Sequence, residues 1–242
     1  MTTPSPGFPG DAAARLTAAN LCVLVDGRDD EIAFARLVAD LFGAGVGCVQ
    51  IRDKRLPTAA LLRRVTLAVD LAARGGAQAP LVIVNDRADV ATAGAADGVH
   101  VGADDLPVAA ARALVGPRCL VGRTAHDPDE VTAAWRDGAD YVGVGPCYPS
   151  ATKAFASHAS SAFLAAAVRS SPRPVFAIGG ITLDRLDALA ALGITRVAVA
   201  AAITAAPDPA RAAAAFLNRL ARPAPSPVPA RPEPGEAGCG GA

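Results

Sequence analysis

The chain carries no excess of either charge. Its 23 lysines and arginines balance 23 aspartates and glutamates, so the formal net charge is +0 at pH 7. A neutral chain has no broad electrostatic attraction for nucleic acid or for an anionic membrane, so any anion binding must be local. We therefore expect neither nucleic acid nor a membrane among its partners.

Long hydrophobic runs are missing too. No apolar stretch reaches the roughly 18 residues that suggest a transmembrane helix. Residues 1–10 hold three prolines and lack the apolar centre of a signal peptide. The five cysteines are odd in number and lack metal-ligand spacing, which predicts reduced thiols in the cytoplasm. No Ser/His/Asp or Cys/His pattern indicates a catalytic triad.

Both ends of the chain differ in composition from the middle. Residues 1–10 are rich in proline and glycine, and residues 222–242 begin with a run in which every second or third residue is proline. Such segments cannot bury enough apolar surface to fold, so we expect two disordered tails around one domain at 11–221. A chain that is 52% hydrophobic has enough apolar side chains for one large core.

Between the tails, short β-rich runs alternate with Ala/Leu-rich helical segments. The predicted strands are 21–25, 47–52, 81–85, 98–101, 119–122, 141–145, 174–178 and 196–200. The predicted helices are 30–42, 58–73, 86–93, 107–114, 127–137, 160–170, 183–192 and 209–222. Repeated βα units predict an α/β fold, a single (β/α)8 TIM barrel. The alternative, an open doubly wound sheet, normally uses fewer strands and a glycine-rich first turn.

Polar residues follow several of these strands, at the end where parallel barrels build their active sites. Arg52 and Lys54 share a direction with Gln50, because residues two apart in a strand point to the same side. The two cations suit a clamp for phosphate or diphosphate. The plainer alternative is a solvated strand end in which a cation pairs locally with Asp53.

Carboxylate side chains follow the next two predicted strands. Asn85 and Asp86 follow one, and Asp104 and Asp105 follow the other. Mg²⁺ takes one or two carboxylates and leaves the rest of its shell to water and substrate phosphate. The alternative is that Asp86 and Asp105 cap the helices that follow them. Beside the cations, the carboxylates favour a metal–diphosphate site.

Later segments add hydroxyls, a lysine and exposed backbone. The loop at 145–153 could close over a substrate, or it could be an ordinary surface loop. Gly179 and Gly180 follow the seventh predicted strand, where backbone N–H groups often bind phosphate in this fold. Among the remaining polar groups, Thr124 could contact a ligand, His126 could be a base or stand at a helix start, and His100 fits a core role.

In these segments the chain resembles the thiamine phosphate synthase family, and the resemblance covers about residues 20–220. The resemblance lies in six segments that each follow the expected strand: Gln50-Ile51-Arg52-Asp53-Lys54, Val84 to Asp89, Asp97 to Gly102 with Asp104 to Pro107, Gly122-Arg123-Thr124-Ala125-His126, Gly145 to Lys153, and Ala177-Ile178-Gly179-Gly180-Ile181.

The resemblance implies a transferase. Family members join 4-amino-5-hydroxymethyl-2-methylpyrimidine diphosphate to a thiazole phosphate, giving thiamine phosphate and pyrophosphate, and the diphosphate leaves first. Both substrates are small molecules. By the same resemblance, Asp86 and Asp105 would bind Mg²⁺, and Arg52, Lys54 and Lys153 would be the catalytic cations. Those three cations would bind the pyrimidine diphosphate together with Gln50 and Asn85. The thiazole phosphate would contact Thr124, Ser150, Thr152, Gly180, Ala200 and Ala201.

The chain departs from the family pattern at Ala103, Ser150 and Ala201, and the segment after Lys153 lacks the family's glycines. The related thiazole tautomerase shares the pattern at 122–126, with His126 as acid and base, but it does not keep the diphosphate–metal set. A noncatalytic barrel that binds thiamine precursors and an unrelated phosphosugar enzyme are further alternatives. The sequence leaves the oligomeric state open, a homo-oligomer included.

Overall fold

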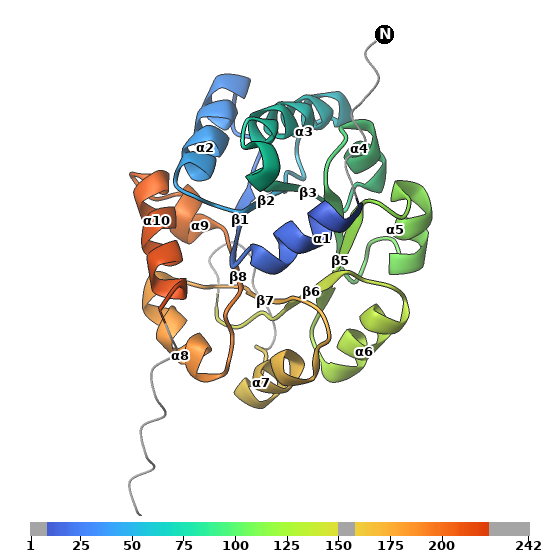
Figure 1. Ribbon diagram of the computed structural model, residues 1–242, viewed down its shortest axis with the longest axis vertical. Helices are drawn as coiled ribbons and strands as arrows, with labels where there is room; N and C mark the ends of the chain where they lie inside the picture. The colour runs from blue at the N-terminus through green and yellow to red at the C-terminus, as the bar shows by residue number, and fades with distance from the viewer. Residues whose placement is uncertain (1–8, 150–157, 223–242) are drawn as a thin grey trace, which may run out of the picture.

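The computed structural model describes residues 9–149 and 158–222 of the chain. Eight parallel strands close into a barrel in the order β1-β2-β3-β4-β5-β6-β7-β8 (Figure 1). They are β1 (Leu21–Val25), β2 (Cys48–Ile51), β3 (Leu81–Asn85), β4 (Gly98–Val101), β5 (Leu120–Ala125), β6 (Tyr141–Val144), β7 (Val175–Ile178) and β8 (Val197–Val199). The predicted TIM barrel is therefore confirmed, and the open-sheet alternative is wrong.

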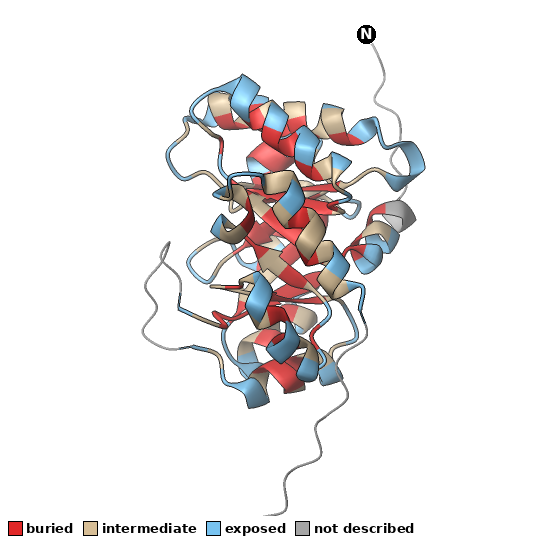
Figure 2. Cartoon of the chain, turned by 90° about the vertical axis from the view of Figure 1, so that its left-hand side faces the viewer, coloured by how far each residue is buried: buried red, intermediate tan, exposed pale blue. Residues whose placement is uncertain are grey.

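Helices surround the barrel between successive strands (Figures 1 and 2). They are α2 (Glu31–Gly43), α3 (Thr58–Ala73), α4 (Ala88–Ala93), α5 (Val108–Val115), α6 (Pro128–Arg136), α7 (Ser161–Ser170), α8 (Leu186–Ala191), α9 (Ala201–Thr204) and α10 (Pro209–Leu220). Single turns of 3₁₀ helix occur at η1 (Gly76–Gln78) and η2 (Leu183–Arg185). Side-chain caps fix several helix starts, as where Asp127 accepts from the Glu130 N–H and Ser160 from the Phe163 N–H.

Alternation along the strands divides the core into two layers. Cys22, Cys48 and Leu81 stand side by side in register and belong to the cluster that fills the barrel. Their successors Val23, Val49 and Val82 belong to the larger cluster between barrel and helices. Because successive strand side chains point to opposite faces, the same rule tells which polar residues face the barrel interior.

One further helix, α1 (Pro9–Ala18), lies across one end of the barrel (Figure 1). Its Leu16 joins the cluster inside the barrel. Arg15 of α1 donates to the Ala79 carbonyl and pairs with Asp97 at 2.6 Å. Ala79 and Asp97 come just before β3 and β4, so α1 closes the N-terminal end of the barrel. The sequence reading placed no helix here, and α1 begins inside the segment 1–10 that it assigned to a tail. Residues 1–8 and 223–242 lie outside the described residues.

Most element boundaries agree with the prediction within a residue or two, and the differences have local causes. β5 runs to Ala125, beyond the predicted end at 122, because Arg123 and Thr124 pair with Val142 and Gly143 of β6. Their polar side chains had suggested a loop. The predicted helix 183–192 is divided into η2 and α8, and the short α9 follows β8 directly.

Candidate active site

Four polar side chains face the barrel interior near the carboxyl ends of the strands. Gln50 stands in register with Ile83 of the interior cluster, and it is only 5% exposed. Asn85, two residues after Ile83, stands in register with His100, and His100 with Gly122, two residues before Thr124. The alternation therefore gives the interior a polar layer at the end where barrel enzymes bind their substrates.

Above this layer, two carboxyl groups and an ammonium meet. Lys54 Nζ lies 3.4 Å from Asp86 Oδ2, and the Asp86 and Asp105 carboxyl groups are close enough to shift each other's pKa. Asp86 adopts φ +62, in the left-handed region, while its N–H donates to the His100 carbonyl at 2.8 Å. Non-glycine residues in this region often mark functional sites. The structure thus brings together three residues that the sequence placed after different strands.

The two carboxyl groups differ in proton affinity. Burial raises the pKa of Asp86, the neighbouring Asp105 raises it further, and Lys54 opposes both. Burial acts the same way on Asp105, but hydrogen bonds from Asp86 and from the Gly102 N–H hold the pKa of Asp105 below its ordinary value. Two carboxylates in contact repel each other unless a proton or a cation lies between them.

This donor set fits a divalent cation. The described residues hold no cluster of three or more His, Cys, Asp or Glu side chains with metal-binding geometry. A pair of carboxylates is nevertheless what Mg²⁺ uses when water and substrate phosphate complete its shell. Neither aspartate is a helix cap: Arg87 stands at the N-cap of α4 and Pro107 at that of α5. The helix-cap alternative is therefore wrong for both.

The two cations after β2 differ in their partners: Lys54 pairs with Asp86, whereas Arg52 is held only through its backbone. The Arg52 N–H donates to the Val25 carbonyl at 2.8 Å, and no described carboxylate pairs with its guanidinium. Asp53 instead accepts from the N–H groups of Gly27, Arg55 and Leu56. Asp53 also pairs locally with Arg55 at 3.6 Å, as the plainer alternative had it. That pair does not involve Arg52, so the Arg52 charge is available to a ligand.

A hydrogen-bonded chain crosses the barrel below these groups. His100 Nε2 lies 2.8 Å from Thr124 Oγ1, and His100 Nδ1 lies 3.2 Å from Tyr141 Oη. Burial first, and the Arg123 charge second, lower the pKa of His100 to about 4, so the ring is neutral at pH 7. The core role expected for His100 is confirmed, and His100 orients the Thr124 hydroxyl at the predicted substrate site.

On the far side of the barrel, Gly180 lies in a confined turn. It adopts φ +62, and a Cβ there would lie 2.4 Å from the Pro149 carbonyl oxygen and 2.5 Å from that of Tyr148. Only glycine fits both the conformation and the space. Ala200 and Ala201 follow β8, where Ala200 stands at the N-cap of α9. Ser150, Thr152 and Lys153 lie outside the described residues.

His126 stands at a helix start, as one of the two expectations had it. Its N–H donates to Glu130 Oε2 at 2.7 Å, next to the N-cap Asp127 of α6. His126 Nδ1 lies 2.6 Å from the Gly145 carbonyl oxygen. A carbonyl only accepts, so Nδ1 carries the proton and the ring is tied to the base of the loop after β6.

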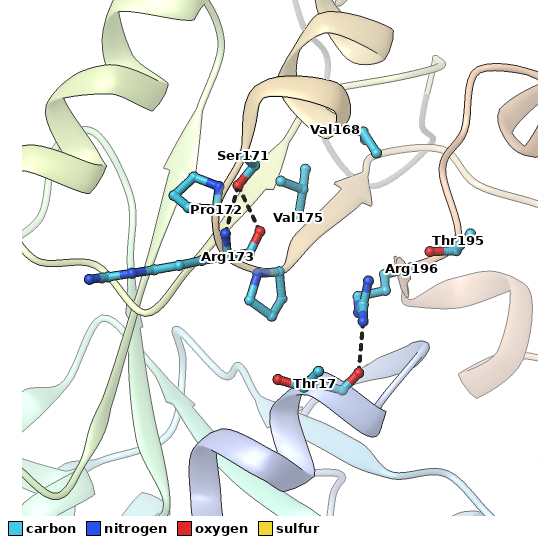
Figure 3. Close-up of a pocket in the computed structure, with 9 residues that line it drawn as sticks. Thr17, Val168, Ser171, Pro172, Arg173, Val175, Thr195 and Arg196 are labelled. Atoms are coloured by element: carbon cyan, nitrogen blue, oxygen red, sulfur yellow. Dashed lines mark hydrogen bonds between the residues drawn. The ribbon is translucent and has the colours of Figure 1, made fainter. Parts of the chain in front are cut away.

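A cavity of about 280 Å³ lies at the opposite end of the barrel (Figure 3). Thr17 of α1 and Arg196, just before β8, line one side, and the Arg196 guanidinium donates to the Thr17 carbonyl at 2.7 Å. The segment 171–174 before β7 lines the other side. The N-terminal face of such barrels usually serves stability, and none of the predicted site residues that the structure describes lines this cavity.

Known proteins resemble this chain over most of its length. Residues 21–203 match the profile of a family described as thiamine monophosphate synthase. The chain belongs to this family. Thiamine-phosphate synthase of Acidothermus cellulolyticus is 43% identical over 210 residues, which cover 86% of the chain and 98% of that protein. The enzyme of that name from Gloeobacter violaceus is 43% identical over 221 residues, which cover 91% of the chain but 63% of that longer protein.

Solved structures of the thiamine monophosphate synthase family give the same result. Thiamine phosphate pyrophosphorylase from Pyrococcus furiosus superposes with a TM-score of 0.74 at 29% identity, covering 86% of the chain and 97% of that protein. A 3-hexulose-6-phosphate synthase superposes with a TM-score of 0.59 at 19% identity, which shows a shared barrel fold and nothing about activity.

Sequence reasoning gave no role to two arginines near the candidate site. Arg185 donates to the Gly180 carbonyl, and its guanidinium lies 4.6 Å from the centre of the Tyr148 ring. Arg123 donates to the Gly102 carbonyl in the loop that carries Asp105. The only sequence signal for Arg123 was its place in the segment 122–126, and no pattern pointed to Arg185.

Proposed function

We propose that the protein is a thiamine-phosphate synthase. It would condense 4-amino-5-hydroxymethyl-2-methylpyrimidine diphosphate with a thiazole phosphate to give thiamine phosphate and pyrophosphate. The observation that carries the proposal is the meeting of Asp86, Asp105 and Lys54 at the carboxyl ends of the strands, in a chain 43% identical to enzymes of that name. Carboxylates beside cations suit a diphosphate with its counter-ion.

The residues would divide the work by their charge. As the diphosphate leaves the pyrimidine carbon, negative charge builds up on its oxygens, and Arg52, Lys54 and Lys153 would stabilise that charge. Gln50 and Asn85, which face the interior, would orient the pyrimidine. Attack by a ring nitrogen needs no general base, in keeping with the lowered pKa of the buried His100.

The thiazole phosphate would lie on the other side of the barrel. Gly180 and the backbone at Ala200 and Ala201 would bind its phosphate through N–H groups, with Thr124, Ser150 and Thr152 as hydroxyl donors. The turn at Gly180 supports this role, because a Cβ would obstruct it. The Thr124 hydroxyl is already oriented by His100.

Asp86 and Asp105 would hold Mg²⁺, which when bound would neutralise part of the diphosphate charge. The contact between the two carboxyl groups supports this assignment. The described residues contain no helix long and apolar enough to cross a membrane. Cys22, Cys48, Cys119 and Cys147 are all free, which supports a reducing, cytoplasmic location.

Pyrophosphate release tests the activity. Purified protein is given Mg²⁺, the pyrimidine diphosphate and the thiazole phosphate, and each component is omitted in turn. We expect release only with all three present, together with thiamine phosphate. Binding of the pyrimidine diphosphate without turnover would instead indicate a noncatalytic barrel. Failure to bind it at all would remove the pyrimidine diphosphate as a substrate of this protein.

A matched pair of variants tests the metal assignment. Asp86→Asn keeps the size of the side chain but removes the charge, and we expect kcat to fall by at least about 100-fold. Asp89→Asn, three residues along, removes an exposed carboxylate that pairs with Arg87 and should keep near-normal activity. Normal turnover in D86N with a native circular dichroism spectrum would remove Asp86 from the site.

A further inference from the structure

The turn that carries Asp105 is closed from two directions. The Gly102 N–H donates to Asp105 Oδ2 at 2.9 Å, and the Asp105 N–H donates back to the Gly102 carbonyl at 3.3 Å. A Cβ at Gly102 would lie 2.9 Å from that same carboxylate oxygen. The direction of the Asp105 carboxylate therefore depends on the orientation of the Gly102 peptide groups.

Arg123 acts on this turn from the neighbouring strand. Its guanidinium donates to the Gly102 carbonyl, the oxygen that also accepts from the Asp105 N–H. Arg123 stands in register with Val101, the last residue of β4, so its side chain begins beside the turn. Its neighbours Gly122 and Thr124 face the interior, so the Arg123 side chain leaves β5 on the outer face of the barrel.

We propose that Arg123 is a positioning residue for the metal site: by holding the Gly102 carbonyl, it fixes the turn that directs the Asp105 carboxylate toward Asp86. The inference rests on the proposed function, because Asp105 matters in this way only if it binds the cation. Groups that orient metal-binding carboxylates typically change metal affinity by about 10- to 100-fold when they are removed.

The sign of the effect separates positioning from simple charge. A guanidinium near the site repels a divalent cation, so removing its charge alone would tighten metal binding. Removing a group that orients Asp105 would weaken metal binding instead. The two explanations therefore predict opposite changes in one measurement that requires no turnover.

The experiment is a titration of substrate-free protein with Mn²⁺, followed by electron paramagnetic resonance. Mn²⁺ serves as the probe because it accepts the same oxygen ligands as Mg²⁺. Arg123→Met keeps the length of the side chain and removes the donor and the charge. Arg123→Gln is measured in parallel, so that the result does not depend on the folding of one variant. Arg123→Lys restores the charge and a donor.

Arg173 offers a matched control, since its guanidinium donates to the Ala139 carbonyl at the opposite end of the barrel. We expect the Mn²⁺ dissociation constant to rise at least about tenfold in R123M and R123Q, less in R123K, and not in R173M. The Mg²⁺ concentration for half-maximal activity should rise in parallel, with kcat largely restored at saturating Mg²⁺.

Unchanged or tighter Mn²⁺ binding in R123M and R123Q would overturn the inference. Asp105→Asn distinguishes the two levels of failure. If D105N loses Mn²⁺ binding while the Arg123 variants keep it, only the role of Arg123 is wrong. If D105N binds Mn²⁺ like the unaltered protein, the proposed metal site is wrong and the inference is overturned with it.

Discussion

Side chains that are adjacent in the sequence have different roles at the candidate site. Asp53 is one residue from Arg52 and Lys54, yet it serves the backbone rather than a ligand. Its side chain is 1% exposed and accepts hydrogen bonds from the N–H groups of Gly27, Arg55 and Leu56. It therefore joins the loop after β1 to the loop that carries both cations.

Stability should depend on the charge of Asp53. Burial works to raise its pKa, but the three backbone hydrogen bonds and the nearby Arg55 charge outweigh burial and hold the pKa below the ordinary value. The folded state thus binds this proton less readily than the unfolded state, so the stabilisation is present above the ordinary pKa of about 4. It is lost as the pH falls through the lower pKa of the folded state.

We expect Asp53→Asn to lower the free energy of unfolding by about 1–3 kcal/mol at pH 7, and by less near pH 3. Urea unfolding at the two pH values measures the change. Exposed Asp70 on α3 provides the control, and D70N should stay within about 0.5 kcal/mol. An equal loss for D53N at both pH values would mean that the charge of Asp53 contributes nothing.

Loops between elements show where the sequence was informative and where it was not. Apolar runs bounded by glycine or by charge predicted all eight strands, because burial on both faces leaves no alternation to misread. The polar strand ends also predicted Asp86 and Lys54 as neighbours. The contact of Arg123 with Gly102 joins residues 21 apart through an outward-facing side chain, and no sequence pattern predicts it.

The turn at Gly180 can be tested against a second glycine whose φ is also positive. Gly180→Ala would place a Cβ 2.4 Å from the Pro149 carbonyl oxygen, so the turn and the loop after β6 must move apart. Gly193 also has a positive φ, +83, but a Cβ there meets nothing within 4 Å. The pair therefore separates backbone strain from displacement of the turn.

We expect G193A to cost about 1–2 kcal/mol of stability and to leave KM for the thiazole phosphate unchanged. G180A should lose more stability and should raise KM for the thiazole phosphate at least about tenfold. Steady-state kinetics with each substrate varied in turn, together with urea unfolding, measures both effects. A raised KM for the pyrimidine diphosphate alone would place Gly180 at the wrong substrate.

In the whole molecule, the candidate site and the helix that closes the core lie at opposite ends of the barrel. The carboxyl ends of the strands carry the candidate site, while α1 closes the N-terminal end (Figure 1). The sequence did not predict α1, because its first residues follow the proline- and glycine-rich start and no strand precedes it. A short helix of this kind is stabilised mainly by packing its apolar side chains, and the surface that they pack against exists only in the folded barrel.

This division predicts that α1 stabilises the fold without affecting substrate binding. Leu16 is 2% exposed in the interior cluster, and Leu16→Ala should lower the free energy of unfolding by about 2–5 kcal/mol. Leu114→Ala makes the same change at a side chain that is 55% exposed and should cost less than about 1 kcal/mol. Urea unfolding measures both losses, and KM for each substrate should match that of the unaltered protein. If L16A raised KM while its stability stayed unchanged, the two ends of the barrel would be coupled, and α1 would be part of the functional machinery rather than a closure of the core.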